Sequence, residues 1–167
     1  MTVETLRVGV ICTGNICRSP MAEVVLKHFV ALDPALDGHV IVTSAGTANW
    51  HVGSPMDPRA RAALDRAGYR RAGTPAAFAD RAYLNAQDLV VVMTREHVDE
   101  VKQRLRRGDT EVLLWRTLLD PETTLDVADP YYGDAQEFDE CLEVLSSGGQ
   151  RLTEELRRRL GARSYEA

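Results

Sequence analysis

The chain has 167 residues, of which 44% are hydrophobic and 27% are charged. This composition fits one globular domain, residues 1–167, and excludes collagenous, low-complexity and wholly disordered chains. The formal net charge of -5 argues against a protein that binds nucleic acid mainly by neutralising phosphates. No run reaches the roughly 18 to 20 apolar residues of a membrane span, and the first residues lack a signal-peptide layout. We expect a cytoplasmic protein that binds no membrane, although export without a signal peptide is an alternative that this pattern does not test.

The first half of the chain alternates strand and helix signals. Residues 6–12 form a short apolar run that favours a strand, and a helical pattern follows after a brief loop. A second strand is predicted over 40–44. Asp57 and Pro58 then read as the cap and first residue of a helix. The first helix is predicted from apolar residues at three- and four-residue spacing: Met21, Ala22, Val25, Phe29 and Leu32.

The second half continues the alternation. Residues 70–78 have no clear period and are expected to form a loop that leads to a short helix over 80–85. The continuous apolar run 88–93 is typical of a parallel strand buried on both faces. Thr94 is expected to cap the following helix, and 111–115 are predicted to form a fourth strand.

The last predicted element is a long helix that begins with the capping-box spacing of 134–137. Its apolar stripe continues across 146–149, where a Ser-Ser-Gly-Gly stretch predicts a kink. Four strands alternating with helices predict a three-layer α/β sandwich with a four-stranded parallel sheet, of flavodoxin-like or Rossmann-like type, in a single domain. Ligands of such folds bind at the carboxyl ends of the strands, and Cys12 lies at the first such end.

The loop after the first predicted strand has the composition of an anion site. Its backbone N–H groups and the following helix dipole favour negative charge, and Arg18 adds a planar fork for two phosphate oxygens. Thiols at helix N-termini or beside cations have pKa values of about 3.5 to 7.5. Cys12 is therefore a candidate nucleophile. The N–H groups belong to Thr13, Gly14, Asn15, Ile16 and Cys17.

The other cysteines have simpler interpretations. Cys17 is equally well explained as a small buried residue, and Cys141 falls on the apolar stripe of the last helix. Three cysteines argue against a secreted disulfide framework, and no second ligand pair accompanies Cys12 and Cys17 for a zinc site. Two thiols in one loop do predict that mild oxidation joins Cys12 to Cys17 reversibly, which would make the site redox-sensitive.

Residues 12–19, continued by Pro-Met-Ala-Glu at 20–23, resemble the signature of the low molecular weight protein tyrosine phosphatases, of bacterial type. The resemblance extends to Thr-Ser-Ala-Gly-Thr at 43–47 and to Asp-Pro-Tyr-Tyr-Gly at 129–133. It implies that Cys12 attacks phosphorus to form a phosphocysteine, that Arg18 clamps the oxygens, and that Asp129 protonates the leaving phenolate and then activates water. It implies no metal or other cofactor.

The resemblance also assigns the surrounding residues. Trp50 and Tyr131 should stand on opposite sides of a slot that takes a phenyl ring, whereas Tyr132 is expected to pack the loop. Hydrogen bonds from Asn15, Ser19 and Ser44 should hold the loop and the thiolate; ordinary turn and cap chemistry is the simpler alternative for these three. A histidine that the family carries soon after Tyr69 is replaced here by Ala-Gly-Thr at 72–74, so its support is missing or replaced.

Three other functions are alternatives. An arsenate reductase on this fold needs two further cysteines, and only Cys141 remains. A protein arginine phosphatase typically has Thr where this chain has Ile16. A phosphate-binding module without turnover would not need both a nucleophile and an acid. The expected partners are therefore tyrosine-phosphorylated proteins, with a cognate tyrosine kinase as a further candidate.

Overall fold

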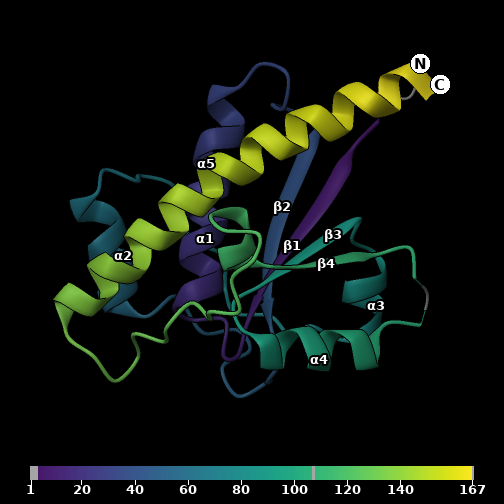
Figure 1. Cartoon of the computed structure of the whole chain (residues 1–167). Helices are drawn as coiled ribbons and strands as arrows, with labels where there is room; N and C mark the ends of the chain where they lie inside the picture. Colours follow the sequence, from purple (N-terminus) through teal and green to yellow (C-terminus); the bar gives the residue numbers. More distant parts are fainter. Residues whose placement is uncertain (1–3, 107, 167) are drawn as a thin grey trace.

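The computed structural model describes residues 4–106 and 108–166, which form an α/β sandwich around one parallel sheet (Figure 1). The strands are β1 (Leu6–Cys12), β2 (Val40–Gly46), β3 (Leu89–Val92) and β4 (Glu111–Leu114), in the order β2-β1-β3-β4. All three pairings are parallel. The predicted four-stranded parallel sheet is confirmed, and the apolar run at 88–93 is an inner strand as expected.

Helices cover both faces of the sheet, which confirms the three-layer architecture (Figure 1). The larger core packs α1 (Arg18–Leu32), α2 (Pro58–Arg66) and α5 (Ala135–Glu166) against one face. The smaller core packs α3 (Arg81–Asn85) and α4 (Arg95–Arg104) against the other. Side chains alternate along a strand, so Val10 of β1 belongs to the larger core and its neighbour Ile11 to the smaller one.

The terminal helix α5 continues through 146–149, and Figure 1 shows no sharp bend there, so the predicted kink is wrong. The glycine pair serves close packing instead. A Cβ on Gly148 would collide with the indole of Trp115, and one on Gly149 would lie 2.8 Å from a methyl of Val25. The glycines therefore let α5 approach its neighbours closely.

Two local features differ from the sequence-based expectation. The fourth strand ends at Leu114, because Trp115 begins the short 3-10 helix η1 (Trp115–Leu118), where its buried indole donates to the Val144 carbonyl at 3.2 Å. Within the expected loop at 70–78, Phe78 forms an isolated parallel bridge with Gly46. This bridge places the segment beside the carboxyl end of β2. No helix in the described residues is long and apolar enough to cross a membrane.

Candidate active site

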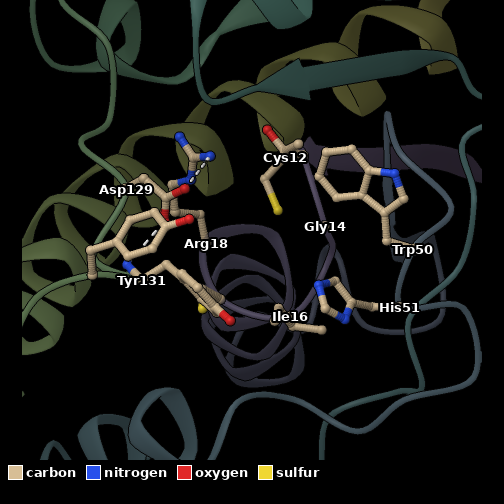
Figure 2. A pocket seen from close by; sticks show the side chains of 11 residues that line it. Cys12, Gly14, Ile16, Arg18, Trp50, His51, Asp129 and Tyr131 are labelled. Atoms are coloured by element: carbon tan, nitrogen blue, oxygen red, sulfur yellow. Dashed lines mark hydrogen bonds and ion pairs between the residues drawn. The ribbon is translucent and has the colours of Figure 1, made fainter.

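The loop between β1 and α1 runs from Cys12 to Arg18 at the carboxyl edge of the sheet (Figure 2). Its backbone is anchored to the chain that follows β2, where Thr47 N–H donates to the Cys12 carbonyl and Ala48 N–H to the Thr13 carbonyl, at 2.9 and 3.0 Å. Gly46 makes this approach possible, because a Cβ there would collide with the Thr13 carbonyl oxygen. The motif at 43–47 thus braces the loop.

Asn15 holds the loop from inside. It is a non-glycine residue in the left-handed region, with φ of 57°. Its Oδ1 accepts from the Ala77 N–H at 2.9 Å, and this bond fixes the orientation of the side-chain amide. The Nδ2 group then donates to Ser19 at 2.7 Å and to Ser44 at 3.0 Å. The structure therefore brings together all three residues that were expected to support the loop.

The Ser19 hydroxyl that Asn15 holds also lies within hydrogen-bond distance of the candidate nucleophile. Ser19 Oγ lies 3.0 Å from Cys12 Sγ. Asn15 donates to this oxygen, and an ionised Cys12 has no proton to give, so the Ser19 hydroxyl is the donor in its hydrogen bond to the thiolate. A hydroxyl that donates to sulfur stabilises the thiolate form.

Arg18 and Asp129 lie in contact on one side of the pocket (Figure 2). The buried guanidinium of Arg18 donates to the Val127 carbonyl at 3.1 Å and lies 3.3 Å from Asp129 Oδ2. Val127 N–H in turn donates to the Met93 carbonyl at the end of β3, at 2.8 Å. The other oxygen of Asp129 accepts from the Tyr131 N–H at 3.1 Å. Asp129 is thus held by Arg18, which is itself tied to the end of β3 through Val127.

A cavity of about 230 Å³ opens above the loop. Trp50 and Tyr131 stand on opposite sides of it, with Cys12 between them (Figure 2). Trp50 is 75% exposed and Tyr131 is half-exposed, so both rings offer apolar surface to a ligand. The cavity is lined by Cys12, Thr13, Gly14, Ile16, Cys17, Arg18, Trp50, His51, Asp129, Tyr131 and Tyr132.

The expected packing role of Tyr132 is wrong. Its side chain is 95% exposed and lies at the mouth of the cavity. It meets Tyr131 edge to face, with ring centroids 4.9 Å apart. The turn that places it is closed by a 2.8 Å bond from Gly133 N–H to the Pro130 carbonyl, which leaves the ring in solvent.

Cys17 is buried, and burial raises the pKa of its thiol well above the ordinary value. At neutral pH it is a neutral thiol rather than an anion in this loop. Its thiol therefore does not compete with Cys12 as a nucleophile.

His97 contributes to the site although the sequence did not single it out. Its Nε2 lies 2.8 Å from the Thr13 hydroxyl, and its buried Nδ1 has no partner among the described residues. Burial, together with the charge of Arg18, lowers the pKa of His97 to about 4. The imidazole is therefore neutral at physiological pH. The predicted cap is present, since Thr94 accepts from His97 N–H at 3.1 Å. The same cap brings the imidazole of His97 to the loop at 12–18, which we call the phosphate loop.

His51 was missed as well. It follows Trp50 and lies in van der Waals contact with Gly14, where an added Cβ would meet its ring at 3.0 Å. The signals that could have found both histidines are positional. His51 follows Trp50, which was expected to form one wall of the slot. His97 lies in the first turn of the helix that follows the inner strand β3.

The segment at 72–74, which stands where the family histidine was expected, contacts α1. The Thr74 hydroxyl donates to the buried carboxylate of Glu23 in α1, at 2.8 Å to the nearer oxygen. The backbone N–H of Ala77, three residues later, donates to Asn15. Thr74 thus ties this part of the chain to α1, and Ala77 ties it to the loop.

The arrangement suits transfer of a tetrahedral oxyanion. The loop amides, the start of α1 and Arg18 concentrate positive potential in front of the Cys12 sulfur. An acid candidate and two aromatic rings border the same cavity. These groups can neutralise a phosphoryl dianion, supply a nucleophile and a proton, and hold an aromatic leaving group.

Comparison with known proteins gives a consistent result along the chain. The family model described as low molecular weight phosphotyrosine protein phosphatase matches residues 7–162. A low molecular weight protein-tyrosine-phosphatase of Streptomyces coelicolor is 38% identical over 165 residues, which cover 96% of this chain and 99% of that protein. The low molecular weight protein-tyrosine phosphatase A of Mycobacterium tuberculosis is 42% identical over 153 residues, covering 86% and 87%.

A solved structure gives the same result for the fold. The crystal structure of a protein tyrosine phosphatase from Entamoeba histolytica superposes with a TM-score of 0.84 at 26% identity. The superposition covers 92% of this chain and 98% of that one. The two proteins therefore share the fold.

Proposed function

The chain belongs to the low molecular weight phosphotyrosine protein phosphatase family, and we propose that it hydrolyses phosphotyrosine in proteins through Cys12, Arg18 and Asp129. The observation that carries these roles is that all three side chains, two from the loop at 12–18 and one from the distant segment before the turn at 130–133, border one cavity between two aromatic rings. The substrates are tyrosine-phosphorylated proteins.

In the first step the Cys12 thiolate attacks phosphorus. The S–P bond forms as the bond from phosphorus to the tyrosine oxygen breaks, and the electron pair leaves with that oxygen. Asp129, protonated at this stage, gives its proton to the oxygen, so tyrosine leaves neutral. The product on the enzyme is a phosphocysteine.

In the second step the Asp129 carboxylate takes a proton from water as the water oxygen attacks phosphorus. The S–P bond breaks and the sulfur leaves as a thiolate. The Ser19 hydroxyl, 3.0 Å away, can donate a hydrogen bond to this thiolate. Inorganic phosphate is released, and Asp129 is again protonated. Arg18 and the loop amides hold the nonbridging oxygens in both steps, where negative charge is redistributed.

The two aromatic rings that border the cavity favour aryl esters. A phenyl ring fills the slot between Trp50 and Tyr131 and gains apolar contact on both sides. A serine phosphate ends before it reaches these rings. We infer that the preference for phosphotyrosine over phosphoserine arises from the contact of the phenyl ring with Trp50 and Tyr131 rather than from phosphate binding.

We also propose that residues 1–167 act as one phosphatase domain in the cytoplasm, opposed by a cognate tyrosine kinase. The loop thiols would make the enzyme redox-sensitive through a disulfide between Cys12 and Cys17. The presence of Cys12 and Cys17 in the lining of one cavity supports this role.

The test is a substrate panel of phosphotyrosine, phosphoserine and phosphoarginine peptides and arsenate with thioredoxin. Wild type should release phosphate from phosphotyrosine, and Cys12→Ser should bind phosphate without turnover. Cys141→Ser, which changes a thiol within the core, is the matched control and should retain activity. Faster turnover of phosphoarginine or reduction of arsenate would replace the proposed function by one of those alternatives. Binding without turnover by wild type would indicate a phosphate-binding module.

A further inference from the structure

Arg59, in the first turn of α2, contacts the turn that forms the Tyr131 side of the cavity. Its Nη1 donates to the Gly133 carbonyl at 3.3 Å, at the end of the turn that bears both tyrosines. The guanidinium carbon lies 5.4 Å from the centre of the Tyr131 ring and 4.7 Å from that of Phe138 in α5. A guanidinium over an aromatic face at such distances is attractive.

The other side of the same guanidinium is tied to the phosphate loop through Asp57. Nε and Nη2 of Arg59 donate to the two carboxylate oxygens of Asp57 at 3.1 and 2.9 Å. Asp57 N–H in turn donates to the Ile16 carbonyl at 2.9 Å. The Arg59 guanidinium also lowers the pKa of the Asp57 carboxyl, so the pair is fully charged at neutral pH.

These contacts make one continuous connection from Ile16 through Asp57 and Arg59 to Tyr131. We propose that Arg59 is a positioning residue that sets the place of the Tyr131 ring relative to the phosphate loop, and so fixes the width of the aromatic slot. This inference rests on the proposed function, because it assigns the slot to the aryl group of the substrate. Arg59 itself does not line the cavity.

Neighbouring contacts separate this role from general stability and from catalysis. Helix α2 is also held by buried Ala60, Ala63 and Leu64 and by an ion pair of Arg66 with Asp139 at 2.7 Å. Asp129 has an anchor independent of Arg59 in Arg18, at 3.3 Å. Loss of the Arg59 fork should therefore weaken binding of a ring far more than binding of phosphate or the chemical steps.

The experiment compares two inhibitors, inorganic phosphate and benzylphosphonate, with wild type, Arg59→Lys and Arg59→Gln. Lysine keeps the charge but cannot span Asp57 and Gly133 with one planar group. We expect benzylphosphonate to bind about tenfold more weakly, which is about 1.4 kcal/mol, while phosphate affinity and kcat stay within about threefold. Arg66→Lys, on the same helix, is the matched control and should change neither affinity.

A double variant tests whether the effect passes through the ring. In a Tyr131→Leu background, Arg59→Lys should produce little further loss of benzylphosphonate affinity, because the ring that it positions is gone. Equal losses for both inhibitors, or fully additive losses in the double variant, would overturn the inference. Thermal unfolding of each variant checks that the fold is retained.

Binding can also be measured by calorimetry in a Cys12→Ser background, where no turnover is needed. If wild type turns over phosphotyrosine and the Arg59 variants keep full benzylphosphonate affinity, the positioning role of Arg59 is refuted and the proposed function stands. Wild type that binds neither inhibitor would refute the proposed function and this inference with it.

Discussion

The Ser19 hydroxyl, whose oxygen accepts from Asn15, lies 3.0 Å from the Cys12 sulfur. When Cys12 is ionised, its sulfur has no proton, so Ser19 is the donor in this hydrogen bond. The orientation of Asn15 is fixed in turn by the backbone of Ala77. A thiolate that leaves phosphorus is thus met by a donor already in place. Such a preorganised donor contributes most when negative charge returns to the sulfur.

Ser19→Ala should therefore slow hydrolysis of the phosphocysteine more than its formation. A hydrogen bond to a charged group contributes about 1.5 to 3 kcal/mol, so we expect kcat to fall by roughly tenfold to a hundredfold. Rapid-quench kinetics with para-nitrophenyl phosphate should then show a burst of nitrophenol before the slower steady state. Ser146→Ala, which removes a hydroxyl bonded to Tyr69 outside the cavity, is the control. An unchanged kcat for Ser19→Ala would remove this hydroxyl from the mechanism.

Asp129→Asn should slow esters with poor leaving groups far more than activated ones, since only the former need a proton on the departing oxygen. The expected loss for phenyl phosphate is roughly 10²- to 10⁴-fold, the usual contribution of a general acid. The measurement is kcat/KM across a series of substituted phenyl phosphates. Asp126→Asn is a matched control, since Asp126 lies on the same loop but caps α4 through the Arg95 N–H. Equal losses along the series would show that Asp129 is not the acid.

The four strands and the positions of most helix caps follow from local patterns that the sequence displays, whereas the strand order was not predicted. Apolar runs predict buried strands, and Asp57, Asp80 and Thr94 each accept from the N–H of a residue in the first turn of the helix that they cap. The prediction of a kink at 146–149 was wrong because glycine in a helix can allow either a bend or the close approach of a neighbouring element. Here the contacts with Trp115 and Val25 show that it allows close approach.

The site was predictable where its chemistry is local to a motif, as for Cys12 and Arg18. Asp129, Trp50 and Tyr131 come from distant segments and were expected only through the family resemblance. His97 and Arg59, which no recognised motif contains, were not expected. The contact of His97 with Thr13 spans 84 positions, and that of Arg59 with Gly133 spans 74. The exposure of Tyr132 depends on how the turn at 130–133 closes, which no periodicity in the sequence reports.

His97 predicts a pH dependence of stability. Its pKa is lowered from 6.5 to about 4 by burial and by Arg18, while Asp126 and Asp129 oppose the shift. Between these values the unfolded chain binds a proton that the folded chain does not, so stability should fall as pH drops from about 6.5 to about 4. The largest loss from this group is about 3 kcal/mol.

The measurement is the urea unfolding free energy between pH 4 and pH 8. His97→Gln should flatten this part of the profile relative to wild type, whereas His39→Gln, at a partly exposed position, should leave its slope unchanged. Identical slopes for wild type and His97→Gln would contradict the neutral, buried state of this imidazole.

The loop thiols predict protection against overoxidation. Peroxide should convert Cys12 to a sulfenic acid, and Cys17 should then displace water to form the disulfide. Because burial raises the pKa of the Cys17 thiol, this second step should be slower at lower pH. Wild type should recover activity with dithiothreitol, and Cys17→Ser should lose that recovery while Cys141→Ser keeps it. Mass mapping that finds sulfinic or sulfonic Cys12 in wild type at mild peroxide concentrations would refute the protective disulfide.

The covalent step at Cys12 is tested most directly by trapping the enzyme during turnover. Acid quenching of wild type with para-nitrophenyl phosphate, followed by peptide mass spectrometry, should place one phosphoryl group on the peptide that contains Cys12, bound through sulfur. The Ser19→Ala variant should accumulate more of this species. Rapid release of phosphate with no phosphoryl group on that peptide in either protein, or turnover by Cys12→Ser near the wild-type rate, would contradict the account.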